Sequence, residues 1–139
     1  MYTISCEAHF DAAHFLQGHQ GACRNLHGHR WKVRAYVSSE TLIEDGGSRG
    51  MVIDFGDIKP VLKSVADSLD HKLIAEKDAL RSETLAALKE EGFEIAEVSF
   101  RPTAENFAKY IFDKLKSGGV TPSKVRVYES EDAYAEYSE

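Results

Sequence analysis

Two histidines two residues apart, with a cysteine four residues ahead of the first, give the run from Cys23 to His29 the spacing of a metal site. In a β-strand, residues i and i+2 point to the same face, so His27 and His29 can bind one ion while Gly28 leaves room for it. Imidazole nitrogens in this arrangement are typical zinc ligands. The sequence therefore predicts that this run binds Zn²⁺.

A third ligand is expected from a strand predicted at Tyr2 to His14. Apolar residues alternate along it, and His14 falls on the apolar face while His9 falls on the other face. A second strand, predicted at His27 to Ser39, alternates in the same way. If the two strands pair antiparallel, His14 comes near the other two histidines. Three histidine ligands leave one tetrahedral position to water or substrate, as in catalytic zinc sites.

Cys23 has two possible roles beside such an ion. A thiol near a metal loses its proton more easily and can act as a base or a nucleophile. The same thiol could instead be the fourth zinc ligand, which would close the site and make it structural. The spacing alone leaves both roles open.

Two further polar sites break the local pattern. Glu129 follows two valines on one parity of a predicted strand, which puts a carboxylate on the core face unless the strand ends just before it. Such a carboxylate can bind a planar heterocycle that presents adjacent N–H donors. Asp70 and His71 end a predicted helix, where the carboxylate can fix the tautomer of a catalytic base, or the histidine can simply interact with the helix dipole.

Length and composition predict one domain, residues 1–139. The chain is 42% hydrophobic with three prolines, which suffices for a single core. A net charge of −6 without a Lys/Arg stripe argues against a nucleic-acid surface, and no apolar run approaches the roughly 20 residues of a membrane span. The start lacks the features of a signal peptide, and two cysteines make no disulfide framework. We therefore expect a cytoplasmic protein.

The predicted elements form an α+β layer. A mostly antiparallel sheet of about four strands has helices on one face. One helix begins after Asp54 and another after Thr103, each with an apolar stripe. Residues 79–100, with a short helix capped by Ser82, look like an insertion. The predicted strands cover 2–14, 27–39, 124–129 and 133–137, with a short strand end at 51–53 and a further strand at 95–100 inside the insertion.

Six short motifs follow one another along the chain. They are Phe-x-Ala-Ala-His ending at His14, Cys-x3-His-Gly-His from Cys23, Asp-x4-Lys from Asp54, Leu-Asp-His ending at His71, Pro-Thr-Ala-Glu-Asn from Pro102 and Val-Tyr-Glu-Ser from Val127. In this order they resemble the motifs of the 6-pyruvoyl-tetrahydropterin synthase family, and within it the 6-carboxy-tetrahydropterin synthase branch. The resemblance covers nearly the whole chain except the insertion. The three residues between Cys23 and His27 resemble the carboxy branch, since animal pyruvoyl enzymes have a longer gap.

The resemblance implies a fold, an assembly and a reaction. Tunnelling-fold subunits join their sheets edge to edge into a barrel, usually as trimers stacked into homohexamers, with active sites between chains. The implied enzyme is a zinc-dependent lyase that converts 7,8-dihydroneopterin triphosphate to 6-carboxy-5,6,7,8-tetrahydropterin, with release of acetaldehyde and triphosphate, in queuosine and 7-deazaguanine biosynthesis. The alternatives are 6-pyruvoyl-tetrahydropterin synthase activity, by triphosphate elimination, and a non-catalytic structural zinc or ligand-binding module.

By position, His14, His27 and His29 resemble the family's zinc ligands. Cys23 resembles the thiol that abstracts a proton. In the family these groups act on the side chain of the pterin substrate.

Five further positions resemble the rest of the family's site. Asp70 and His71 correspond to the relay that assists proton transfer. Glu129 corresponds to the acid that binds the pterin ring, and Thr103 and Glu105 stand where residues help to line the pterin pocket.

Overall fold

The two long alternating segments form the centre of the sheet. β1 (Tyr2–His14) and β2 (His27–Ser39) pair antiparallel along their whole length, from Tyr2 opposite Ser39 to His14 opposite His27. One parity of each strand is buried and the other faces outward, as the alternation predicts. The computed structural model describes residues 1–139 and confirms the predicted bounds of both strands.

The sheet has six strands in the order β4-β3-β1-β2-β5-β6, so the predicted four were too few. β5 (Lys124–Ser130) and β6 (Ala133–Ser138) continue the antiparallel part beside β2. β3 (Lys72–Glu76) and β4 (Ile95–Val98) add a parallel part beside β1, which makes the sheet mixed. β3 was missed because it is short and its pairing partners lie far away in sequence.

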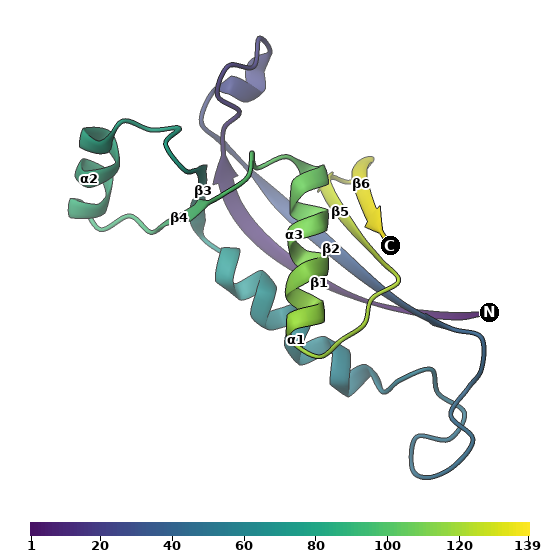
Figure 1. The fold of residues 1–139 in the computed structure, drawn as a ribbon. Coiled ribbons are helices and arrows are strands. Elements are labelled where there is room, and N and C mark those ends of the chain that lie inside the picture. Colours follow the sequence, from purple (N-terminus) through teal and green to yellow (C-terminus); the bar gives the residue numbers. More distant parts are fainter.

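Two amphipathic helices cover one face of the sheet (Figure 1). α1 (Phe55–Leu69) begins where Asp54 accepts a hydrogen bond from the backbone N–H of Gly56, and α3 (Ala104–Ser117) begins where Thr103 accepts one from Asn106. Both predicted caps are confirmed. The helices bury the predicted apolar stripes against the strands.

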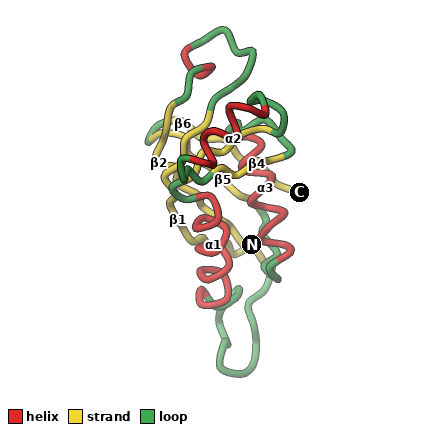
Figure 2. The backbone as a smooth tube through the Cα atoms, turned by 90° about the vertical axis from the view of Figure 1, so that its left-hand side faces the viewer, coloured by secondary structure: helices red, strands yellow, loops and turns green.

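In the segment from 79 to 100, β4 belongs to the edge of the sheet, whereas the part before it lies to one side of this layer. Its helix α2 (Ser82–Glu90) buries no residue, and Arg81, not Ser82, is the capping position. The expected strand at 51–53 was also wrong, since these residues form no strand. Figure 2 shows two long loops, 15–26 and 40–54, projecting from opposite ends of the molecule.

Three aromatic side chains fill the core next to the ends of β1 and β2 that carry the histidines. Trp31 stacks on Phe10 with a ring separation of 5.9 Å, and Phe107 of α3 meets Trp31 edge-on at 4.9 Å. All three side chains are almost fully buried. This packing provides a rigid base for the residues at the ends of the two strands. None of the helices is both long and apolar enough to cross a membrane.

Candidate metal centre and active site

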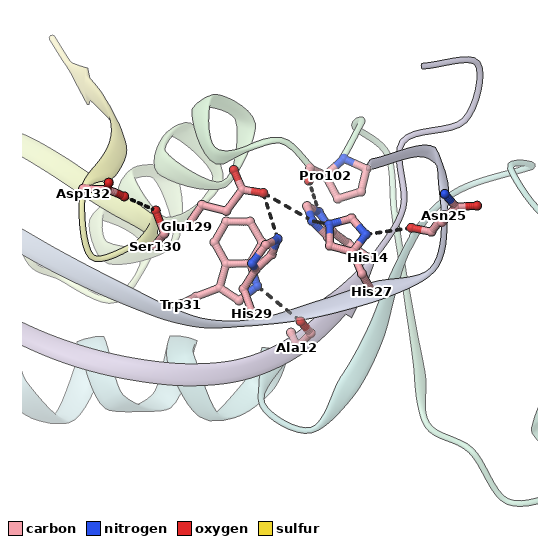
Figure 3. Close-up of polar contacts among 10 residues, drawn as sticks. All are labelled: Ala12, His14, Asn25, His27, His29, Trp31, Pro102, Glu129, Ser130 and Asp132. Carbon is pink, nitrogen blue, oxygen red and sulfur yellow. Dashed lines mark hydrogen bonds and ion pairs between the residues drawn. The ribbon is translucent and has the colours of Figure 1, made fainter. Parts of the chain in front are cut away.

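Strand pairing brings the three predicted histidine ligands together. His14 ends β1 directly opposite His27, the first residue of β2, and His29 follows on the same parity. The rings of His14 and His29 contact Trp31 edge-on, and Glu129 of β5 reaches toward the histidines from the next strand (Figure 3). The nearest ligand atoms of these three histidines and Glu129 all lie within 4.8 Å of one another.

Two backbone carbonyls fix the tautomers of His14 and His27. Nδ1 of His14 lies 2.7 Å from the carbonyl oxygen of Pro102, and Nδ1 of His27 lies 2.7 Å from that of Asn25 (Figure 3). A carbonyl can only accept a hydrogen bond, so each Nδ1 carries the proton, and in a neutral ring Nε2 keeps its lone pair. Metal-binding histidines typically donate their other ring N–H to a carbonyl in this way.

The resulting arrangement fits a bound cation. The Nε2 atoms of His14 and His27 are only 3.0 Å apart, so two lone pairs face each other without a proton between them. The buried Nε2 of His29 has no hydrogen-bond partner with acceptable geometry, although Oε1 of Glu129 is 2.9 Å away. A metal ion would satisfy these nitrogen atoms together.

Burial also keeps two of these rings in the form that binds metal. Loss of hydration lowers the pKa of His14, which is 2% exposed, and the pKa of His29 is lowered chiefly for the same reason. A lowered pKa leaves both rings neutral at pH 7, and a neutral imidazole is the ligand form.

Glu129 points toward the histidines rather than into solvent. Its Oε1 lies 2.9 Å from Nε2 of His29 and 3.6 Å from Nε2 of His14, and its side chain is 33% exposed. The strand does not end before it, but an irregularity between Tyr128 and Ser130 shifts the register there. The carboxylate therefore lies on the core face, one of the two outcomes that the sequence left open, and it is the fourth group of the cluster.

Cys23 lies outside this group. It sits in a short 3-10 helix, η1 (Ala22–Arg24), in the loop before β2, and its thiol is free and partly buried. The ligand atoms within 4.8 Å of one another come from the histidines and Glu129 and do not include the Cys23 sulfur. The geometry thus argues against Cys23 as the fourth ligand.

Asp70 and His71 form the predicted pair. Oδ2 of Asp70 accepts a hydrogen bond from Nδ1 of His71 at 2.7 Å, which leaves the histidine Nε2 free. The backbone N–H of Asp11 donates to Asp70 and, together with His71, lowers the pKa of Asp70. In turn, the Asp70 hydrogen bond raises the pKa of His71, whose ring is well exposed. Such a pair suits proton transfer.

The remaining predicted residues take up peripheral positions. The Thr103 hydroxyl accepts the backbone N–H of Asn106 and so caps α3. Glu105 is exposed in the first turn of the same helix and does not join the cluster. The connection of α3 to the metal centre is instead the carbonyl of Pro102, which no sequence pattern indicated.

A pocket of about 620 Å³ lies at the end of β1 and is lined both by His71 of the relay and by His29 of the histidine cluster. Its apolar wall includes Leu88 and Phe93 of the segment 79–100, and its polar residues include Asp11, Arg30 and His71. Asp11 and Arg30 were not predicted as site residues. Only the predicted β1–β2 pairing, which puts them directly opposite each other, could have indicated a link between them.

Comparison with known proteins identifies the family. The family described as 6-pyruvoyl tetrahydropterin synthase matches residues 3–139. The chain belongs to this family.

Two sequence relatives agree with that membership, and two solved structures share the fold. The chain is 39% identical to the 6-carboxy-5,6,7,8-tetrahydropterin synthase of Haemophilus influenzae, over 100% of both chains. It is 37% identical to the Synechocystis protein of the same name, over 86% of this chain and 79% of that one. An uncharacterized Wolinella succinogenes protein superposes with a TM-score of 0.82 at 24% identity, covering 99% and 97% of the two chains. Caenorhabditis elegans 6-pyruvoyl tetrahydropterin synthase gives 0.70 at 25% identity, covering 99% and 95%.

Proposed function

We propose that the chain is a zinc-dependent carbon–carbon lyase with 6-carboxy-5,6,7,8-tetrahydropterin synthase activity. It would convert 7,8-dihydroneopterin triphosphate to 6-carboxy-5,6,7,8-tetrahydropterin, acetaldehyde and triphosphate, on the route to queuosine and 7-deazaguanine. The observation that carries the proposal is the convergence of three histidines in a chain that also holds the Asp70–His71 pair. Full-length relatives of that name support it further.

Zinc is the proposed ion because imidazole ligands with one further open position match its preferences. His14, His27 and His29 would hold it. When bound, zinc would polarise the oxygens of the substrate side chain and stabilise developing negative charge. Glu129 is proposed to accept hydrogen bonds from the N–H donors of the pterin ring, with Thr103 and Glu105 contributing to the wall of that pocket.

The chain's own groups are proposed to move the protons. Cys23 would take a proton from the substrate side chain, and its place in the loop beside the cluster suits this role. His71 would accept or donate a proton at Nε2, because Nδ1 is already bonded to Asp70. Asp70 would fix the ring and stabilise its charged form.

The active site is proposed to form between subunits of a homohexamer built as a dimer of trimers. Within one chain, His14 faces the helices, whereas Asp11 has the opposite strand parity and its carboxylate lies beside Asp70 and His71. The relay of one chain would therefore act at the metal centre of a neighbour. Native mass spectrometry measures the subunit number, and a monomer active at assay concentrations would contradict this arrangement.

Product analysis tests the reaction. Metal-replete protein given 7,8-dihydroneopterin triphosphate should yield acetaldehyde and a carboxypterin by mass spectrometry. A 6-pyruvoyl product would instead support the second candidate, the activity after which the C. elegans protein is named. Metal-replete protein that forms neither product would refute both enzymatic proposals.

Replacing Cys23 separates catalysis from a structural zinc module. Cys23→Ala should retain the metal and the fold but lose at least about 100-fold in kcat, the scale of a general base. Cys6→Ala is the matched control, since that thiol is buried in the core far along β1. Loss of both metal and fold in Cys23→Ala, but not in the control, would favour the structural module.

We also propose that residues 79–100 are an insertion into a single domain, and that the protein is cytoplasmic. The free thiols of Cys6 and Cys23 agree with a reducing compartment. Because α2 buries no residue, replacing residues 80–91 with a short Gly/Ser linker should change the free energy of unfolding by about 1 kcal/mol or less. A larger loss, measured by urea denaturation, would identify the segment as part of the core unit.

A further inference from the structure

Asp11 contacts both residues of the Asp70–His71 pair through its backbone. Its N–H donates to Oδ1 of Asp70 at 2.8 Å, and its carbonyl accepts the backbone N–H of His71 at 2.7 Å. One residue of β1 thus holds the carboxylate and the main chain of the histidine at the same time. Neither bond involves the Asp11 side chain, which stays available for another role.

This backbone attachment maintains an unfavourable conformation at His71. The residue has a φ of +57°, in the left-handed region that non-glycine residues rarely adopt. Such a conformation persists only where the surroundings determine it. The Asp11 carbonyl fixes His71 on one side, and pairing of Lys72 and Leu73 with Ala12 and Ala13 fixes the chain directly after it.

The Asp11 carboxylate lies close to the imidazole ring of His71. Its ligand oxygen, one from Asp70 and the nearest ring nitrogen of His71 all lie within 4.8 Å of one another. Arg30, opposite Asp11 in the register, approaches that carboxylate to 3.5 Å and is itself 68% exposed. The histidine ring therefore has two carboxylates beside it, one bonded directly and one held near by an arginine.

We propose that Asp11 is a positioning residue of the proton relay: its backbone holds Asp70 and His71, and its carboxylate, held by Arg30, stabilises the protonated imidazole. The inference rests on the proposed function, in which His71 exchanges a proton at Nε2. When Nε2 is protonated the ring becomes a cation, and a second carboxylate favours that form. Arg30 opposes it, so the Asp11–Arg30 pair sets how readily the ring takes and releases the proton.

Other charged groups near the ring are few. Lys72 follows His71 in sequence, and both Lys72 and Glu94 line the same pocket. Asp70 bonds the ring directly, and the remaining ionisable side chains that line the pocket are Asp11, Arg30 and His29. The Asp11 carboxylate also contributes to raising the pKa of His71, after the larger effects of Asp70.

Asp11→Asn tests the carboxylate while keeping the side-chain shape and both backbone bonds. The pKa of His71 can be followed by NMR in the intact, metal-loaded protein, with His71→Gln assigning its signal among those of the six histidines. We expect the pKa of His71 to fall in Asp11→Asn, to rise in Arg30→Gln, and to recover in Asp11→Glu. Asp113→Asn, which removes an exposed carboxylate of α3 paired with Lys109, should leave it unchanged.

The rate profile provides the functional measurement. In Asp11→Asn, kcat should fall by several-fold to about tenfold, a smaller loss than the roughly 100-fold expected for removing His71 itself. The acidic limb of the pH profile of kcat should move to lower pH, and KM should change little. An unmoved His71 pKa in Asp11→Asn, with a clear fall in Asp70→Asn, would overturn the proposal. The titration needs no substrate, so it tests this inference independently of the proposed reaction. Failure of the proposed reaction would be detected by product analysis of the wild-type protein.

Discussion

His27→Gln should have different effects on stability with and without the metal. The glutamine amide nitrogen can occupy the place of Nε2, which in the native protein faces Nε2 of His14 at 3.0 Å. Because the amide is a donor, it replaces two opposed lone pairs with one hydrogen bond, worth about 1 kcal/mol. The substitution also removes the bond from Nδ1 to the Asn25 carbonyl, a loss of similar size at a part-exposed site.

The metal-free variant should therefore unfold within about 1 kcal/mol of metal-free wild type. With metal the result differs. An ion present at about 1,000 times its Kd stabilises the native state by about 4 kcal/mol. If losing the His27 ligand weakens binding at least about 100-fold, the variant loses about 3 kcal/mol of that stabilisation, since each tenfold in Kd is about 1.4 kcal/mol.

Urea denaturation at one protein concentration, with EDTA or with excess zinc, measures both values, and elemental analysis gives the bound metal. His9→Gln is the matched control, because that histidine lies on the opposite parity of β1. The reasoning fails if metal-free His27→Gln is itself destabilised by about 3 kcal/mol. It also fails if zinc stabilises the variant as strongly as the wild type.

Two other predictions concern pH and the core. The pKa values of His14 and His29 are lowered by folding, so the unfolded chain binds more protons once the pH falls below its ordinary histidine value, about 6.5. Metal-free stability should thus decrease as the pH is lowered from about 6.5 toward the folded-state pKa values, and urea midpoints that stay constant over pH 5 to 7 would contradict this. Phe107→Ala, at a fully buried ring against Trp31, should cost about 3–5 kcal/mol of unfolding free energy, whereas exposed Phe55→Ala should cost far less.

The central strands and the histidine cluster could be predicted because local pattern determines them. β1 and β2 each alternate over 13 residues, which sets their bounds and puts His14 and Trp31 on the buried side. The register then follows from the paired ends of the two strands. β3 is different: it has five residues, and only Ala12 and Ala13 of β1 pair with it. Its state depends on a distant partner, which alternation cannot reveal.

The details that give the site its chemistry depend on backbone groups. The carbonyls of Asn25 and Pro102 fix two tautomers, and the Asp11 main chain holds the relay. Every residue type except proline carries the same N–H and C=O, so sequence patterns contain no direct record of which ones bond to a side chain. Glu129 has the parity of the buried Val125 and Val127, but parity cannot show that its carboxylate meets the histidines of the two other strands.

Two strand edges that lack a partner strand indicate that this chain assembles with a second copy, as the proposed shared active site also requires. β3 pairs with β1 only at Ala12 and Ala13, so the edge of β1 from Tyr2 to Asp11 has no strand beside it. β6 forms the other edge of the sheet. Long free edges invite pairing with another chain, and in soluble proteins they are normally covered. A second copy whose β6 pairs with this β1 would cover both kinds of edge. In the proposed assembly the same neighbour would bring its Asp70–His71 pair to this metal centre, so disrupting this edge should reduce activity and assembly together.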